Sequence, residues 1–189
     1  MNLDLYTDRL LLRPLRLDDL DLCIEMFTVA EVIRYIGELE TAENIERDMP
    51  KYIKRCAGGC IGVWCIFDKN SDERLGTTAL VPMPINLDDT DWDLIEGPDI
   101  PGGDIEIGYI LRKPAWGKGI ASEAASRLLR FAFEDTPLSE VVATLDDGNL
   151  NSRHVLEKIG MREMGKRRTY AEDGCADFRI TREHWQELQ

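Results

Sequence analysis

Residues 104–126 predict a strand, a glycine turn and the start of a helix in immediate succession. Between residues 104 and 111, apolar side chains alternate with other types, which is the period-two pattern of a strand with two different faces. Pro114 ends the strand because proline has no N–H group to donate to a ladder. From Ile120 the apolar residues recur at helical spacing, as expected for a helix packed on a sheet. The sequence therefore predicts a fold in which this strand and this helix are joined by a short connection that contains Gly117-Lys118-Gly119.

The Gly117-Lys118-Gly119 turn is a candidate anion site. Glycines let the backbone approach a ligand closely, and the first N–H groups of a helix have no partner inside the helix. Two familiar phosphate motifs do not fit. A P-loop would need glycine at Arg112 and serine or threonine at Gly119, and a dinucleotide fingerprint would need glycine at Ser122. The alternative interpretation is a tight strand-to-helix connection without a ligand.

Three blocks of the sequence resemble the GNAT N-acetyltransferases. They are TDRLLLRPLRLDD at residues 7–19, EIGYILRKPAWGKGIASEA at 106–124 and NLNSRHVLEKIGM at 149–161, and they follow the order and spacing of that family. Within the family they are similar to the RimJ/RimL-like branch, which acetylates the N-termini of ribosomal proteins. The resemblance is specific for the family and not for the substrate. It implies one α/β domain over residues 1–189, with a mixed, mainly antiparallel sheet that is splayed at its centre and flanked by helices.

The resemblance also implies acetyl-CoA as cosubstrate and no metal. The usual GNAT pyrophosphate loop reads Gln or Arg, two residues, Gly, one residue, then Gly or Ala. This chain has Trp116 at the first position, which departs from the general pattern but is similar to the RimJ/RimL-like branch. The residues expected to contact the cosubstrate are Ile110, Leu111, Trp116, Gly117, Lys118, Gly119, Ile120, Ala121, Ser122 and Asn149.

Acetyl transfer by direct attack needs a group that takes a proton from the amine. The reference pKa is near ~8 for an α-amine and ~10.4 for lysine, so a lysine-type acceptor depends more on a base. Glu106 matches the acidic residue of the branch, and a carboxylate base contributes a factor on the order of 10²–10⁴ in rate. The alternative is a solvent-facing sheet residue. Asp104 shares the face of Glu106 and is the substitute candidate.

The departing thiolate of CoA must gain a proton. Many GNAT enzymes use a tyrosine in the helix after residue 149, but the matching position here is Leu156. The RimJ/RimL-like branch uses a serine one turn earlier, and Ser152 occupies that position as the candidate acid. Asn149 would contact the pantetheine arm or the acceptor. Both residue types also suit a helix N-terminus as caps, whatever the protein does.

Composition excludes several classes of protein. A chain of 189 residues can bury one full core but not two. The net charge of −13 disfavours nucleic-acid binding, which depends on clustered Lys and Arg. No apolar run approaches the ~18 residues of a membrane span, and no signal peptide is visible, which predicts a cytoplasmic protein. The five cysteines lack paired CxxC spacing, so reduced and mostly buried thiols are expected, and the Cys56/Cys60 pair has too few histidines to complete a metal site.

The remaining periodic segments predict the other elements of the domain. The predicted strands are 3–14, 62–67, 75–81, a buried parallel strand at 140–145, and 162–169 and 175–181 around a turn at 172–174. The predicted helices are one beginning at 18–19, one at 41–56 divided by Pro50, and one after Asn149 that ends at Gly160.

Residues 82–103 stand out as a proline-rich loop insertion with little periodicity. No Lys or Arg occurs from Leu75 to Leu111, while eight acidic residues do. A loop this long in a compact domain is usually functional or mobile. Because it leads into the strand of Glu106, we expect it to overhang the acceptor cleft and to attract a cationic amine. The alternative is an acidic solvated loop without a substrate role.

Three classes of acceptor stay open: a protein N-terminal amine, a polyamine or lysine-like metabolite, and an aminoglycoside-type amine. A homodimer is compatible with the sequence. The alternative function, from another class, is a non-catalytic acyl-CoA-binding module that uses the same loop for sensing or as a scaffold.

Overall fold

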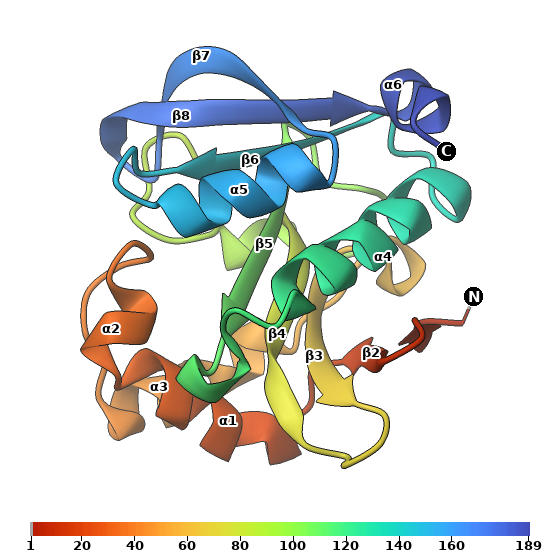
Figure 1. Ribbon diagram of the computed structural model, residues 1–189. Helices are drawn as coiled ribbons and strands as arrows, with labels where there is room; N and C mark the ends of the chain where they lie inside the picture. Colours follow the sequence, from red (N-terminus) through yellow and green to blue (C-terminus); the bar gives the residue numbers. More distant parts are fainter. Residues whose placement is uncertain (1) are drawn as a thin grey trace.

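One mixed sheet organises the computed structural model, which describes residues 2–189 (Figure 1). Within that range the strand order is β1-β2-β3-β4-β5-β6-β8-β7. The strands are β1 (Leu5–Tyr6), β2 (Leu10–Pro14), β3 (Gly62–Asp68), β4 (Arg74–Pro82), β5 (Ile105–Leu111), β6 (Glu140–Leu145), β7 (Arg162–Thr169) and β8 (Glu172–Thr181). The helices are α1 (Leu20–Phe27), α2 (Ala30–Ile33), α3 (Ala42–Tyr52), α4 (Ile120–Glu134), α5 (Leu150–Lys158) and α6 (Arg182–Glu187). Short 3₁₀ turns are η1 (Leu17–Asp19), η2 (Ala57–Gly59), η3 (Trp92–Leu94) and η4 (Lys113–Ala115).

The centre of the sheet is the one parallel pair of strands in the described chain. β5 and β6 run parallel, whereas the other neighbouring strands are antiparallel. The parallel pair shares one Cα partnership, Glu106 with Val142, so the two strands diverge from each other away from that point. This arrangement confirms the expected mixed, mainly antiparallel sheet that is splayed at its centre. It also puts the candidate base at the joint between these two strands.

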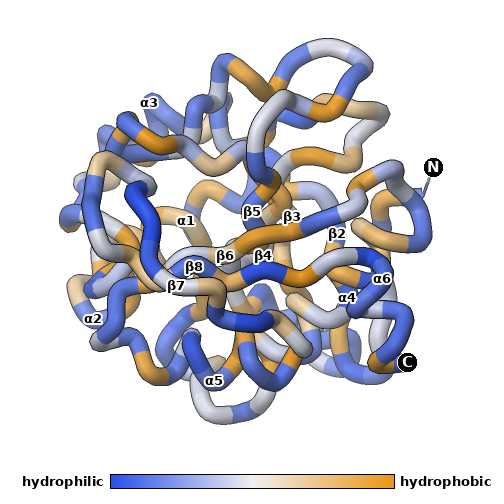
Figure 2. The backbone as a smooth tube through the Cα atoms, turned by 90° about the horizontal axis from the view of Figure 1, so that it is seen from above, coloured by the Kyte–Doolittle hydropathy of each residue, from blue (hydrophilic) through white to orange (hydrophobic). Residues whose placement is uncertain are grey.

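Side chains of β5 pack in two separate hydrophobic clusters. Ile105, Ile107 and Leu111 belong to the cluster that includes the buried side of α4. Ile110 packs against a second cluster, built mainly from α1, α3 and β3. Alternate residues of a strand point to opposite faces, so helices cover both faces of the sheet. Figure 2 shows hydrophobic stretches on the central strands, interrupted by hydrophilic ones, and further hydrophobic segments in the surrounding loops and helices.

Two predicted elements differ in detail. The expected strand 3–14 is a tight hairpin of β1 and β2, closed by a hydrogen bond from Thr7 N to Leu10 O (2.9 Å). Pro50 was expected to divide a helix, but α3 continues past it to Tyr52. A proline in the last turn removes only one helical hydrogen bond, and the donation from Ile53 N to Met49 O (3.2 Å) is retained.

The turn between the last two strands also lies elsewhere than expected. Glycine and acidic residues predicted a turn at 172–174, yet β8 begins at Glu172 and the turn is Tyr170-Ala171. Both turn residues have positive φ, 51° and 58°. A two-residue hairpin with this backbone matches the twist of the strands and normally selects Asn and Gly.

The acidic loop at 82–103 is irregular apart from η3 and a short extension of the sheet, yet it is anchored at several points. Ile95 is buried, and the Trp92 ring packs on Tyr52 with centroids 5.2 Å apart. Lys54 donates to the Trp92 carbonyl (3.1 Å). The first part of the loop accepts backbone hydrogen bonds from Tyr170 and from the residue after it. No helix in residues 2–189 is long and apolar enough to cross a membrane.

Candidate active site

The segment between β5 and α4 forms a cradle of backbone donors. Gly117 and Gly119 have φ values of 71° and 75°, in the left-handed region that favours glycine. Gly119 is the residue before the first turn of α4. Among the hydrogen bonds of the described chain, none is donated by the backbone N–H groups of residues 117–122, whereas Glu123 N already donates to Gly119 O (3.1 Å). We call residues 117–122 the amide cradle.

The cradle is held in position from both sides. The Trp116 indole donates to the Leu111 carbonyl (2.9 Å), which ties the start of the loop to the end of β5. From the β1–β2 hairpin, Arg9 donates to the Lys118 carbonyl (3.1 Å) and to the Glu123 carboxylate (2.7 Å). Unpaired N–H groups at the positive end of a helix dipole, fixed in this way, are suited to bind a phosphate.

The structure sorts the predicted cosubstrate residues into two groups. Ile120, Ser122 and Leu111 are buried, so their side chains belong to the core and their backbone would make any ligand contact. Trp116 is 37% exposed, and Lys118 is exposed, so these side chains reach the surface. Ile110 faces the second hydrophobic cluster. Gly117, Gly119 and Ala121 complete the amide cradle.

Glu106 lies in the joint between β5 and β6 and is 7% exposed. Its Oε1 accepts hydrogen bonds from both the backbone N–H and the hydroxyl of Thr144 on β6, each at 3.0 Å. Its Oε2 accepts from the Tyr170 hydroxyl at the β7–β8 turn (2.5 Å). The interpretation as a solvent-facing sheet residue is therefore wrong, because the carboxylate is buried and bonded by Thr144 of β6 and by Tyr170 of the β7–β8 turn.

The surroundings of Glu106 alter its proton affinity. Burial raises the pKa of Glu106, because a charged carboxylate loses its hydration inside the protein. Hydrogen bonds from Tyr170 and Thr144 lower that pKa and offset part of the effect. Burial also raises the pKa of Tyr170, so the phenol keeps its proton and serves as donor. The carboxylate is thus a stronger proton acceptor than a hydrated glutamate, and it is held in one orientation.

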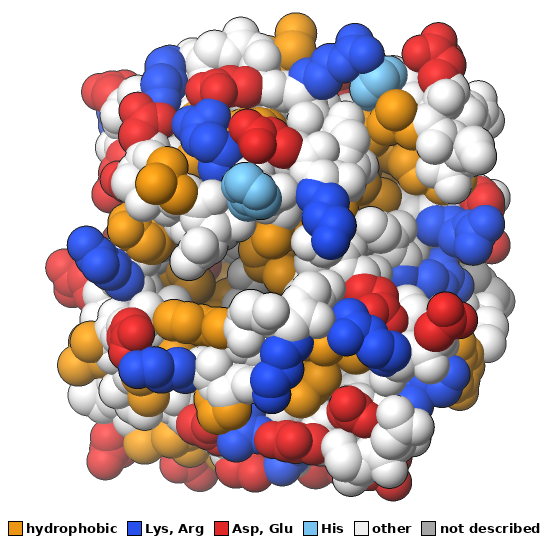
Figure 3. All heavy atoms as spheres, viewed as in Figure 1, with side chains coloured by type: hydrophobic (Ala, Val, Ile, Leu, Met, Phe, Trp, Pro, Cys, Tyr) orange, Lys and Arg blue, Asp and Glu red, His pale blue; other side chains and the backbone are white. Residues whose placement is uncertain are grey.

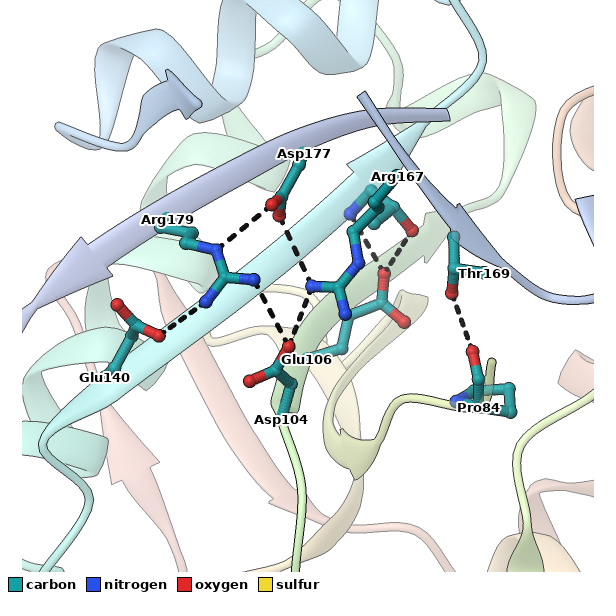
Figure 4. A network of polar contacts seen from close by, with 9 residues as sticks. Pro84, Asp104, Glu106, Glu140, Arg167, Thr169, Asp177 and Arg179 are labelled. Atoms are coloured by element: carbon teal, nitrogen blue, oxygen red, sulfur yellow. Dashed lines mark hydrogen bonds and ion pairs between the residues drawn. The ribbon is translucent and has the colours of Figure 1, made fainter. Parts of the chain in front are cut away.

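Asp104, the substitute candidate, is engaged elsewhere. Its Oδ2 lies 2.7 Å from the Arg167 guanidinium and 3.4 Å from that of Arg179 (Figure 4). The same two arginines contact Asp177, and Arg179 also pairs with Glu140 (2.8 Å). Figure 4 shows Glu106 beneath this network, close to Arg167. Asp104 thus fastens β7 and β8 to the start of β5 through its two arginine partners.

Asn149 and Ser152 lie at the start of α5, as predicted. Asn149 Oδ1 accepts from Ser152 N (3.2 Å), so the asparagine is the N-cap of the helix. Ser152 is partly exposed, and its carbonyl accepts from the Tyr109 hydroxyl of β5 (3.2 Å). The Tyr109 bond links β5 to α5 across the diverging strands. Figure 3 shows this face hollowed below α5, with hydrophobic side chains visible in the hollow and basic ones around it.

The basic cluster at 166–168 is bound to acids. Lys166 contacts Asp147, Arg167 contacts Asp104, and Arg168 pairs with Asp173 (3.0 Å). Arg168 also donates to Asn86 Oδ1 in the loop at 82–103 (3.2 Å). Within residues 2–189, no group of three or more His, Cys, Asp or Glu side chains is arranged to hold a metal ion.

Three residues of the site escaped the sequence analysis: Arg9, Thr144 and Tyr170. Arg9 belongs to the block at 7–19, but nothing in the sequence indicates that its side chain reaches residue 118. Thr144 sits in the predicted strand 140–145, where the apolar run conceals a polar function. The sequence offers one indication of Tyr170, because a tyrosine between two polar strands is an unusual turn residue.

Comparison with known proteins agrees with this geometry. The sequence matches the family described as acetyltransferase (GNAT) domain over residues 9–162. A Bacillus licheniformis protein called uncharacterized N-acetyltransferase p20 is 30% identical over 168 residues, which are 88% of this chain and 86% of the relative.

Solved structures share the fold. An acetyltransferase of the GNAT family from Bacillus anthracis superposes with a TM-score of 0.74 at 22% identity, covering 95% of this chain and 99% of the other. Spermidine N-acetyltransferase from Vibrio cholerae, in complex with CoA and spermine, gives a TM-score of 0.71 at 17% identity, covering 95% and 99%. From its sequence match and its splayed sheet, this chain belongs to the GNAT family of acetyltransferases.

Proposed function

We propose that the protein transfers the acetyl group of acetyl-CoA to a primary amine by direct attack of the amine on the thioester. The observation that carries this proposal is the amide cradle, with its unpaired N–H groups at residues 117–122. Glu106 lies five residues upstream of Leu111 on β5, about 17 Å away along an extended strand. A ligand anchored in the cradle, which follows the end of β5, must extend back along the strand to reach Glu106, as the long pantetheine arm of CoA can.

Glu106 is the proposed base. It takes the proton that the amine loses, either directly or through a water molecule, while the amine nitrogen bonds to the thioester carbon and the carbon–sulfur bond breaks. Ser152 supplies a proton or a hydrogen bond to the departing thiolate, and Asn149 contacts the pantetheine arm or the acceptor. Support for these roles comes from the burial of Glu106 and from the exposed start of α5.

For the acceptor, we favour a protein N-terminal amine, as in the RimJ/RimL-like branch. The support is the run at 106–124 together with Ser152 in place of the tyrosine that other GNAT enzymes use. A small cationic amine, such as a polyamine or an aminoglycoside, is the second candidate. The acidic loop at 82–103 favours it, because negative charge raises the local concentration of cations.

The test is an assay of free thiol with acetyl-CoA and a panel of amines: peptides with a free N-terminus, spermidine and an aminoglycoside. We expect turnover with at least one class and acetylation of its amine by mass spectrometry. Binding of CoA without turnover would support the non-catalytic module instead. If calorimetry detects no binding of CoA, both functions are contradicted.

The free thiols support a cytoplasmic location for this activity. Cys23, Cys56 and Cys65 are buried free thiols, and burial raises their pKa, which keeps them protonated and unreactive.

A further inference from the structure

Tyr170 links the acidic loop to the candidate base. Its hydroxyl donates to Glu106 Oε2 (2.5 Å), and the Thr90 side chain of the loop is close enough to that hydroxyl to offset part of the rise in the pKa of Tyr170. Thr90 is 8% exposed and Glu106 is 7% exposed, so the residues on both sides of the hydroxyl are buried. A hydrogen bond in a low-dielectric interior is stronger than the same bond in water.

The two-residue turn that carries Tyr170 has a strained backbone. Tyr170 and Ala171 have φ values of 51° and 58°, a conformation that residues with a side chain rarely adopt. An Asn-Gly turn would relieve the strain at the same place in a hairpin. The chain instead has a tyrosine there, and its hydroxyl is the group that reaches Glu106. Strain that persists in a structure is typical of functional sites.

The tip of the β7–β8 hairpin is also fastened to the acidic loop. Tyr170 N donates to Pro84 O and Ala171 N to Ile85 O, both at 3.2 Å. The Thr169 hydroxyl donates to the same Pro84 carbonyl (2.8 Å), as Figure 4 shows. Tyr170 is thus held by backbone bonds to residues 84–85 and by its side chain between Thr90 and Glu106.

We propose that Tyr170 is a positioning residue for acetyl transfer, whose hydroxyl orients the Glu106 carboxylate and makes its basicity depend on the placement of residues 84–90. This inference rests on the proposed role of Glu106 as base. Tyr170 lies outside the sequence motif at 106–124.

The effect on proton transfer follows from the groups that face the carboxylate. Tyr170 supplies one of the three donors, and Thr144 supplies the other two. Arg167 of β7 is the charged group whose field reaches Glu106, while Asp89 of the loop faces Tyr170, and the β4 partner of Glu106 is the uncharged Val81. Burial raises the pKa of Glu106, and the hydrogen bond from Tyr170 opposes that rise. Without the Tyr170 hydroxyl, the Glu106 carboxylate therefore becomes protonated at higher pH.

The experiment compares Tyr170→Phe with Tyr6→Phe, a control in β1 whose side chain is 54% exposed. The pH profile of kcat/KM is measured with one acceptor, so that the ionisation of the acceptor is common to all profiles. We expect the acidic limb of Tyr170→Phe to move to higher pH, with kcat/KM about tenfold lower at the acidic end, the worth of one charge-assisted hydrogen bond. Thr90→Val should move the limb less and in the same direction, and Tyr6→Phe should match the wild type.

A fall of kcat/KM by one factor at every pH, with the limb unmoved, would assign Tyr170 a purely structural role and overturn the proposal. The titration of the Glu106 carboxyl by ¹³C NMR gives a readout that does not need turnover. Its signal is assigned by its loss in Glu106→Gln, and its midpoint should rise in Tyr170→Phe. An unmoved midpoint overturns the proposal for Tyr170, whereas a wild-type protein that turns over no amine contradicts only the proposed function.

Discussion

At the scale of the residue, the proposed function of Glu106 opposes the stability of the fold. The carboxylate is buried in the joint between β5 and β6, where an ionised group loses most of its hydration. Three hydrogen bonds offset that loss only in part, since the pKa of Glu106 is raised. A group whose pKa is higher in the folded than in the unfolded protein makes folding less favourable once it ionises. A purely structural residue at this joint would have no reason to be charged.

The substitution Glu106→Gln tests this opposition. Glutamine keeps the acceptor for Thr144 and cannot accept a proton, so kcat/KM should fall by on the order of 10²–10⁴. In the wild type, the free energy of unfolding decreases as the pH rises above the ordinary glutamate pKa near 4.5, because the unfolded protein ionises Glu106 more readily. The variant lacks this decrease. The melting temperature of Glu106→Gln relative to the wild type should therefore rise as the pH increases from about 5 to 8.

Differential scanning calorimetry across that pH range measures the effect. Glu134→Gln, an exposed residue of α4, is the matched control and should change neither activity nor the pH dependence of melting. A Glu106→Gln variant with wild-type turnover would remove Glu106 from the reaction.

How far the sequence predicts this site depends on the separation of its residues along the chain. Strand alternation predicted that Glu106 lies on a strand, and the resemblance at 106–124 made it the candidate base. Its partners lie 38 residues away at Thr144 and 64 residues away at Tyr170, and no local pattern encodes contacts at such separations. The role of Tyr170 was further hidden because the glycine at 174 indicated a turn in the wrong place.

At the scale of the element, the amide cradle depends on backbone conformation more than on side chains. Gly119→Ala forces a Cβ into a left-handed residue with φ of 75°, which should cost about 1 kcal/mol in stability. The backbone would relax toward negative φ and turn the N–H groups of the cradle away from a common point. We therefore expect weaker binding of CoA by isothermal titration calorimetry.

Gly97→Ala provides the matched control for the cradle. Gly97 has φ of 74°, and no heavy atom lies within 4 Å of an added Cβ, so the strain is the same but the cradle is untouched. Both variants should lose similar stability, and only Gly119→Ala should lose affinity for CoA. Equal affinities in the two variants would contradict the cradle as the phosphate site.

The β7–β8 turn gives a second test at this scale. Ala171→Gly relieves the left-handed strain at φ of 58° but adds the entropic cost of glycine. The free energy of unfolding should rise by about 0.5 kcal/mol in total. Ala171→Ser retains a Cβ and should leave stability unchanged. Chemical denaturation measures both, and a destabilised Ala171→Gly would show that the turn is not strained.

At the scale of the whole molecule, the order of helices and strands followed from sequence periodicity, whereas their long-range contacts did not. The alternation at 104–111 and the apolar run at 140–145 predicted β5 and β6, including their parallel pairing. The attachment of the β7–β8 tip to residues 84–85 uses backbone atoms, which carry no sequence signal. The acidic loop is consequently tied to Glu106 through a hairpin from the far end of the chain.

The net charge of −13 gives the acidic loop a testable role in acceptor binding. Asp88 and Asp99 are exposed residues of this loop. If the loop attracts a cationic acceptor, Asp88→Asn with Asp99→Asn should raise the KM for spermidine several-fold without changing kcat, because long-range attraction affects encounter and not chemistry. Added salt should reduce the difference between variant and wild type, since exposed charges are screened beyond about 8 Å at physiological ionic strength.

The matched control removes the same charge elsewhere, with Glu183→Gln and Glu187→Gln on α6. Steady-state kinetics at two salt concentrations, for spermidine and for a peptide whose only amine is its N-terminus, separates the acceptors. A larger KM for both amines in both double variants would indicate a general effect of net charge. A KM that rises only for spermidine, and only in the loop variant, would identify a polycation as the acceptor that the loop at 82–103 selects, because a single α-amine carries too little charge to respond as strongly.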